Sequence, residues 1–185
     1  MFVLFIGLGN ACSVMVGNKI GERDKETAFE YSRRFIIVTV AFSALGGALV
    51  FFSRGLIAGL YQVSDSARFD LMNIMTVYAF SSWLRAYNFM LFIGAFRAGG
   101  DTRYAMFTEL FSIWLIGVPA ALIGGFVIHL PVYYVYALVL LEELVKAIVI
   151  TRRYLSRKWI HDLVNVTADS TPLLSAVEPD SASQP

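Results

Sequence analysis

Charged side chains inside long apolar segments are the residues of this sequence with the clearest chemical potential. Arg85 interrupts one apolar stretch near its middle, and Glu109 lies early in the next. Glu142, Glu143 and Lys146 occupy the second half of a further stretch. Placing one charge in hydrocarbon costs about 2.5 to 3.5 kcal/mol on insertion scales, so we expect such residues to serve a binding site or a specific ion pair.

Polar residues at helical spacing surround Arg85. Tyr78, Ser81, Ser82 and Asn88 follow one another at steps that bring them onto the face of a helix shared with Arg85. Two interpretations of Arg85 stay open: it lines an internal cavity, or it pairs with a carboxylate of a neighbouring helix. In both, its side chain must face other helices and not lipid.

The acidic residues are expected to differ in their surroundings. Glu142 and Lys146 are four residues apart and should pair with each other. Glu143 points elsewhere on the helix and is expected to be freer. Glu109 is expected to lie near Arg103 or lipid headgroups, in contact with water, and a role in the cavity is the alternative.

The remaining reactive residues do not form an enzyme or metal site. His129 and His161 are far apart, and the sequence has no HExxH, phosphate-loop or Ser/His/Asp pattern. Cys12 is the one cysteine, so an internal disulfide is impossible, and we interpret it as a small packing residue. We therefore expect no catalytic residue, no bound metal and no cofactor.

Composition predicts that these residues lie in a membrane. Of the 185 residues, 57% are hydrophobic and 16% are charged, against roughly a quarter charged in soluble domains. The formal net charge of +1 gives no reason to expect a nucleic-acid partner. The fold predicted is an all-α, polytopic transmembrane helix bundle in the lipid bilayer, with five spans at residues 1–18, 35–53, 71–96, 104–128 and 131–150.

The basic residues predict how the chain is oriented. One side of the predicted bundle collects Lys19, Arg23, Lys25, Arg33, Arg34, Arg97, Arg103, Arg152, Arg153, Arg157 and Lys158, and the other holds Arg54 and Arg68. The positive-inside rule makes the first side cytoplasmic. Residues 1–159 then form the bundle, and 160–185 form a disordered cytoplasmic tail rich in Ser, Asp, Pro and Ala. Because the chain starts inside a span, we expect a preceding helix to be missing.

Two glycine-containing patterns predict how helices meet. Gly9, Ser13, Gly17 and Gly21 are spaced four apart, which favours close approach of another helix in lipid. The segment from Gly94 through Arg97 to Gly100, Asp101, Thr102 and Arg103 predicts a helix end, a tight turn and a new helix capped by Asp101 or Thr102. A well-made turn between helices is sufficient to explain the second pattern.

The second pattern also resembles the G-x-x-R-x-x-G-D-T-R loop of the multidrug and toxic compound extrusion (MATE) family. Segments 9–21, 114–119, 142–146 and 157–159 look like other parts of that family, in the correct order. The resemblance covers residues 1–159. It implies the eighth to twelfth helices of a twelve-helix, two-lobe transporter in the plasma or inner membrane, whose N-terminal lobe is missing here.

The implied activity is export of small organic, often cationic compounds in exchange for Na⁺ or H⁺. Some members carry an acidic residue on the tenth helix, but residues 71–96 have none, so we expect the coupling-ion site in the missing part. The predicted substrate or cavity residues are Tyr78, Ser81, Arg85, Asn88, Trp114 and Glu143. The predicted structural residues are Gly9, Gly17, Gly21, Gly94, Arg97, Gly100, Asp101 and Thr102.

Two alternatives remain open. One is a flippase for lipid-linked oligosaccharides with the same architecture, and the other is a membrane subunit or truncated fragment that does not transport. A lining rich in Arg and Lys would favour the anionic flippase substrate, whereas aromatic and carboxylate side chains favour organic cations. Here one arginine accompanies many aromatic residues, which favours drug-like cations.

Overall fold

The computed structural model describes residues 2–62 and 64–161, and this part of the chain is helical, without a strand. Its elements form five rods, namely α1 (Phe2–Gly21); α2 (Lys25–Leu60); α3 (Asp65–Phe89) with the π-helix η1 (Met90–Phe96); α4 (Thr102–Ser112) with η2 (Ile113–Gly117), α5 (Val118–Leu122) and η3 (Ile123–Val127); and α6 (Val132–Leu155). The predicted all-α membrane bundle is confirmed.

Within the described residues, three rods are long and apolar enough to cross a membrane by length and composition: Val3–Gly21, Lys25–Leu60 and Thr102–Val127. The rod of α3 and η1 and the helix α6 are not among these three. The predicted span limits remain predictions, because a helix end and a membrane border need not coincide. The predicted tail begins inside the described part, where Ile160 is buried, and residues 162–185 lie outside the described residues.

The helix α2 starts earlier than the charge-free segment it contains. Asp24 occupies its N-cap position, and the Asp24 side chain accepts a hydrogen bond of 3.0 Å from the Thr27 backbone N–H. That bond satisfies one of the free donors of the first turn. The charged residues 25–34 therefore continue directly into the apolar part of the helix.

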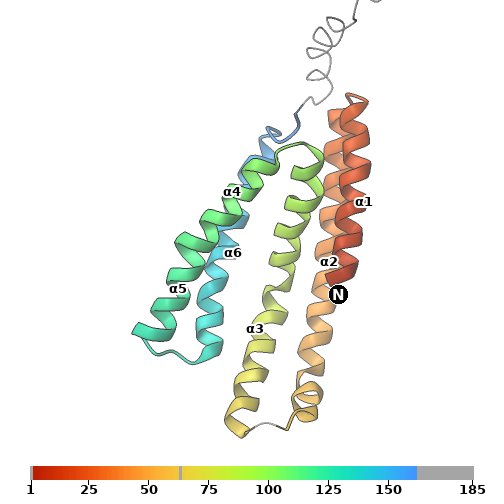
Figure 1. Cartoon of the computed structure of the whole chain (residues 1–185). Helices are drawn as coiled ribbons and strands as arrows, with labels where there is room; N and C mark the ends of the chain where they lie inside the picture. The colour runs from red at the N-terminus through yellow and green to blue at the C-terminus, as the bar shows by residue number, and fades with distance from the viewer. Residues whose placement is uncertain (1, 63, 162–185) are drawn as a thin grey trace, which may run out of the picture.

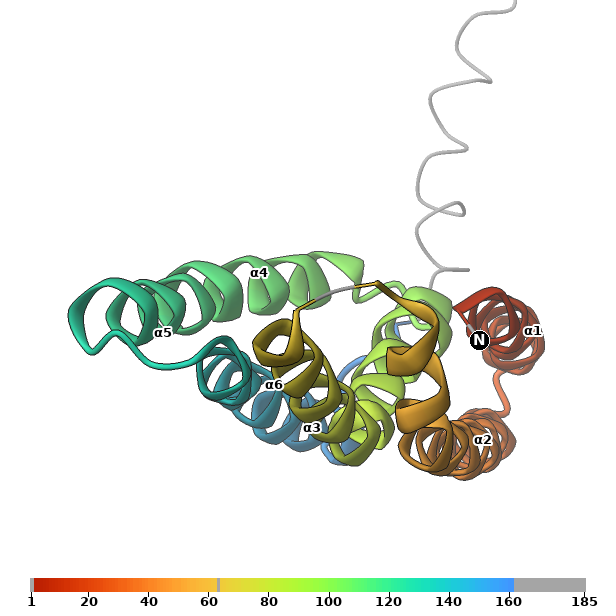
Figure 2. The same ribbon diagram turned by 90° about the horizontal axis from the view of Figure 1, so that it is seen from below.

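The rods follow one another around an open arc (Figures 1 and 2). The helix α1 packs against α2 and η1, α3 packs between α2 and α6, and α4 packs against α6. In the end-on view, α1 and the α4–α5 rod form the two extremes of the arc. The side chains of α3 that lie inside the arc are thus framed by the outer helices.

A core of buried side chains closes one end of the bundle. Cys12, Met90, Leu91, Phe96 and Trp159 are fully buried there, which agrees with a packing role for the cysteine. The ends of α1, η1 and α6 meet the starts of α2 and α4 at this end (Figure 1). This arrangement gathers the residues that the charge pattern assigns to the cytoplasm, although which side the end faces remains a prediction.

The loop between η1 and α4 turns as the glycines predicted. Gly100 has a positive φ of 80°, which favours glycine. Gly99 lies so close to Trp159 that a Cβ atom would overlap the Trp159 backbone carbonyl. Asp101 occupies the N-cap position of α4, but its carboxylate binds Arg153 and forms no side-chain cap. Arg97 is exposed and reaches Asn10 at 3.4 Å.

The glycine stripe of α1 is only partly used for packing within the described residues. A Cβ on Gly9 would lie 3.0 Å from Ile93 Cγ2 of η1, so the two helices approach closely there. A Cβ on Gly17 or Gly21 would meet no atom within 4 Å. Among the described residues, the close approach occurs at Gly9, and for Gly17 and Gly21 it stays a prediction.

Candidate functional site

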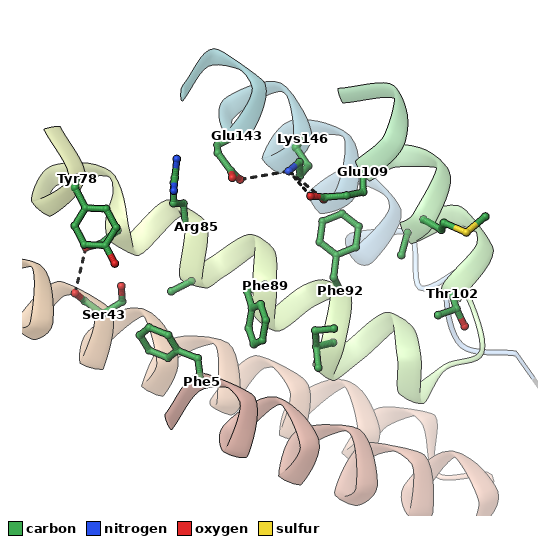
Figure 3. Close-up of a pocket in the computed structure, with 15 residues that line it drawn as sticks. Phe5, Ser43, Tyr78, Arg85, Phe89, Phe92, Thr102, Glu109, Glu143 and Lys146 are labelled. Carbon is green, nitrogen blue, oxygen red and sulfur yellow. Dashed lines mark hydrogen bonds and ion pairs between the residues drawn. The ribbon is translucent and has the colours of Figure 1, made fainter. Parts of the chain in front are cut away.

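A cavity of about 540 Å³ lies on the inner side of the arc. Residues of α3 form one wall, residues of α4 and α6 form the opposite wall, and Phe5 and Ser43 contribute from α1 and α2 (Figure 3). Three aromatic side chains line the wall formed by this rod: Tyr78 and Phe89 of α3, and Phe92 of η1. This volume and lining suit a small, largely apolar ligand.

Lys146 is the central charge of the cavity wall. Its side chain is 3% exposed, and its Nζ atom lies 2.9 Å from Glu142, 3.0 Å from Glu109 and 3.7 Å from Glu143. Glu142 and Glu143 belong to the same helix, whereas Glu109 comes from α4. The Lys146 ammonium therefore links α6 to α4 within this wall of the cavity (Figure 3).

Glu143 links α6 to α3 in a similar way. Asn88 Nδ2 donates to Glu143 Oε2 at 2.7 Å and to the Glu143 backbone carbonyl at 3.0 Å. Asn88 is 3% exposed, and its Oδ1 atom is buried without a hydrogen-bond donor in the described part of the chain. An acceptor of this kind, beside a carboxylate, is costly unless a proton or a cation approaches it.

Arg85 lines the same cavity one turn before Asn88. Its guanidinium carbon lies 5.3 Å from the centre of the Tyr136 ring, a cation–π contact between α3 and α6. The Arg85 Nε atom is buried and has no hydrogen-bond acceptor among residues 2–62 and 64–161. Arg85 therefore borders the cavity, as the first interpretation expects. Its contact with the neighbouring helix α6 is with an aromatic ring, where the second interpretation expects a carboxylate.

Most of the residues predicted from the sequence meet here. Tyr78, Arg85 and Glu143 line the cavity, and Asn88 supports Glu143 from behind. Ser81 is buried outside the lining and donates to the Tyr78 backbone carbonyl at 3.2 Å.

Trp114 does not reach the cavity. It lies on η2 and is 64% exposed, although Gly117 of the same segment faces Glu142. A π-helix holds more residues in each turn than an α-helix. Residues three apart therefore diverge, and the grouping of Trp114 with the cavity is corrected.

Two acidic residues have contacts that were not predicted from the sequence. Glu109 pairs with Lys146 on the cavity wall, which favours its role in the cavity over a pair with Arg103. Glu143 has a longer ion pair with Lys146 than Glu142 has, but Asn88 also binds it. The predicted pair of Glu142 and Lys146 is confirmed at 2.9 Å. The sequence did contain a signal for the Glu109 contact: Lys146 lies in one apolar helix, and Glu109 lies in another without an acidic or basic partner in its own helix.

Three carboxylates surround Lys146. In the described part of the chain, Glu109, Glu143, Lys146 and Arg85 line the cavity, and Glu142 pairs with Lys146 without lining it. Like charges close together in a poorly solvated site favour binding of a further cation. Among the described residues, no group of three or more His, Cys, Asp or Glu side chains has the arrangement of a metal site.

Comparison with known proteins agrees with this architecture. A model of the MatE family matches residues 1–123. The chain is 27% identical over 164 residues to the uncharacterized transporter YisQ of Bacillus subtilis, covering 86% of this chain and 35% of YisQ. It is 28% identical over 117 residues to the probable multidrug resistance protein NorM of Photorhabdus laumondii, covering 63% of this chain and 26% of NorM.

A plant relative extends the comparison. The protein DETOXIFICATION 22 of Arabidopsis thaliana is 27% identical over 162 residues, covering 85% of this chain and 32% of the relative. This chain thus spans about a third or less of the length of these relatives. No solved structure matches it. Because the family model covers well over half of the sequence, the chain belongs to the MatE family, the multidrug and toxic compound extrusion family that its glycine-containing loop resembles.

Proposed function

We propose that this chain is part of a secondary active transporter that exports organic, often cationic compounds in exchange for Na⁺ or H⁺ by alternating access. The observation that carries the proposal is the cavity in which aromatic residues of α3 face the carboxylates around Lys146. Aromatic faces and carboxylates both attract organic cations. The names of NorM and DETOXIFICATION 22 agree with such an activity.

The flippase alternative is less well supported by the lining. An anionic, lipid-linked substrate calls for a surplus of Arg and Lys on the cavity wall. Here Lys146 is already neutralised by carboxylates, and Arg85 lies against Tyr136. Export of a cation suits these charges better than movement of an anion.

Alternating access requires two lobes that rock about a shared site. Five helical rods supply less than one lobe, so we expect the missing N-terminal lobe to be the principal partner of this chain. The coupling-ion site is expected there as well. We therefore expect that the 185-residue chain alone gives no efflux.

The test is efflux of ethidium from cells that lack their own multidrug pumps. One strain expresses this chain, and another expresses a chimera in which the chain replaces the matching segment of the Photorhabdus NorM relative. We expect efflux from the chimera and none above the empty vector from the chain. A chimera that reaches the membrane in normal amounts but leaves ethidium in the cells would contradict the proposal.

The proposal also includes a topology in the cell membrane with a cytoplasmic C-terminus. Reporter fusions after Lys25, Gly100 and Arg157 should report the cytoplasm, and fusions after Tyr61 and His129 the outside. The physical reason is the unequal distribution of Lys and Arg between the two ends of the rods. Inverted signals at any two of these positions would exclude this orientation.

A further inference from the structure

Lys146 occupies the place that a bound cation would take. Carboxylates approach its ammonium from two helices, and the side chain is 3% exposed. Arranging several carboxylates around one point is the usual way of binding a cation at a site with little water. Here the cation is supplied by the chain itself.

The acidic partners of Lys146 are not equivalent. The Glu142 side chain is 10% exposed, and the Glu143 side chain is 18% exposed and held by Asn88. The Glu109 side chain is 45% exposed and borders the cavity. Within the described residues, Lys146 is the ion-pair partner of Glu109. A ligand in the cavity therefore meets Glu109 first.

Loss of Glu109 would not leave Lys146 unpaired. Its ammonium would still have Glu142 at 2.9 Å and Glu143 at 3.7 Å. A ligand can therefore replace Lys146 at Glu109 without leaving the buried Lys146 ammonium unpaired, which would cost several kcal/mol. The Asn88 Oδ1 atom on α3, next to Glu143, is buried and lacks a donor in the described part of the chain, which is a second sign that the surroundings of Glu143 can accept added positive charge.

Resting on the proposed function, we propose that Lys146 is a tethered counter-cation: its ammonium holds Glu109 when the cavity is empty, and a cationic ligand displaces it from Glu109. Lys146 then stays with Glu142 and Glu143. Because Lys146 competes with the ligand, it lowers the affinity of the cavity for cations. The same exchange breaks one link between α4 and α6, so ligand binding changes how these helices are joined.

The test measures binding of tetraphenylphosphonium, a cation without hydrogen-bonding groups, to the full chain in lipid nanodiscs by equilibrium dialysis. Lys146→Met removes the competitor and should tighten binding about tenfold, a change in free energy of about 1.4 kcal/mol. Glu109→Gln should weaken binding by a similar factor. The double variant should bind like Glu109→Gln, because the gain from removing Lys146 requires the Glu109 charge.

Two further variants control the measurement. Lys19→Met removes another lysine that pairs with a glutamate, at 2.6 Å from Glu22 near the end of α1, and should leave binding unchanged. Lys146→Arg keeps the buried charge and keeps the chain folded if Lys146→Met does not accumulate. The arginine fork should hold Glu109 more firmly and weaken binding.

The outcomes separate this inference from the proposed function. If the parent chain binds the cation and the Lys146 variants bind it equally well, the counter-cation role is wrong and the cavity still takes cations. If the gain in Lys146→Met persists in the double variant, the competition does not act through Glu109, and the inference also fails. If a folded parent chain binds no cation, the counter-cation role is wrong, whereas the proposed function is still decided by efflux from the chimera.

Discussion

Arg153 Nε lies 2.8 Å from Asp101 Oδ2, and this ion pair joins the last turns of α6 to the loop that precedes α4. The Arg153 guanidinium also lies 4.8 Å from the centre of the Tyr104 ring. The Asp101 side chain is 10% exposed, so the pair is largely shielded from water. The loop that identifies the family is thus fastened to the end of the last helix through a residue of its own motif.

Removing this ion pair should destabilise the bundle. Asp101→Asn keeps the shape of the side chain but loses the charge, and we expect a loss of about 1 to 3 kcal/mol in the free energy of unfolding. The change in the free energy of unfolding is measured by unfolding the purified chain in a series of increasing concentrations of a denaturing detergent. Arg97→Gln serves as the control, because Arg97 is exposed in the same loop. Equal stability of the two variants would contradict a structural role for the pair.

A second prediction concerns the crossing of α2 and α3. A Cβ on Gly47 would lie 2.5 Å from the Ala79 backbone oxygen and 2.6 Å from Ser82 Oγ. Gly47→Ala should therefore force the helices apart and cost about 1 to 3 kcal/mol. In the same helix, a Cβ on Gly55 would meet no atom within 4 Å. Gly55→Ala should have no cost or a gain of up to about 1 kcal/mol. The melting temperatures of the two variants are compared with that of the parent, and only Gly47→Ala should melt at a lower temperature.

The third prediction is that Arg85 influences which compounds are moved. Arg85→Ala removes a cation from the cavity wall, so the NorM chimera should keep its membrane level while its preference shifts towards more positively charged dyes. Arg85→Lys should keep part of the parental preference, since the charge remains but the planar donor group is lost. Efflux of a cationic and a zwitterionic dye is compared. An unchanged ratio for Arg85→Ala would assign the residue to structure.

The fourth prediction is that the stabilisation of α2 by its N-cap residue Asp24 depends on pH. Hydrogen bonds from Thr27 hold the pKa of the Asp24 carboxyl below its ordinary value of 3.8. Stabilisation by the Asp24 charge is therefore complete above this ordinary pKa and disappears as the pH falls through the lower pKa of the folded chain. The melting temperature of the parent should exceed that of Asp24→Asn at neutral pH, and the difference should vanish in strong acid. A difference that is independent of pH would mean that the charge has no part in capping α2.

Local patterns in the sequence were enough to predict the helices and the loop. The helix over residues 35–53 was predicted from its lack of charge, and the loop was predicted from the glycines before Asp101. Both predictions use only residues that are close together in the sequence. The pair of Glu142 and Lys146 was predictable for the same reason, because four residues bring two side chains to one face of a helix.

The Glu109 contact was not predictable in this way. Glu109 and Lys146 are 37 residues apart in the chain, so their meeting depends on how α4 is rotated and shifted against α6. The π-helical segment η2 changes the rotation of the helix within this rod, which a period of 3.6 residues does not anticipate. Trp114 was misplaced for the same reason. The partner of Asn88, Glu143, likewise comes from a helix far along the chain.

The length of α2 has a consequence for depth in the bilayer. Arg34 and Arg54 flank its charge-free part, and at about 1.5 Å per residue they are about 30 Å apart, the thickness of the hydrocarbon layer. With both guanidinium groups at its borders, the helix cannot slide along the membrane normal without burying one of them. Ser43, which borders the cavity, is then about 13 Å below one border. We therefore expect the length of α2 between its two arginines to fix the depth of the cavity near the midplane of the membrane.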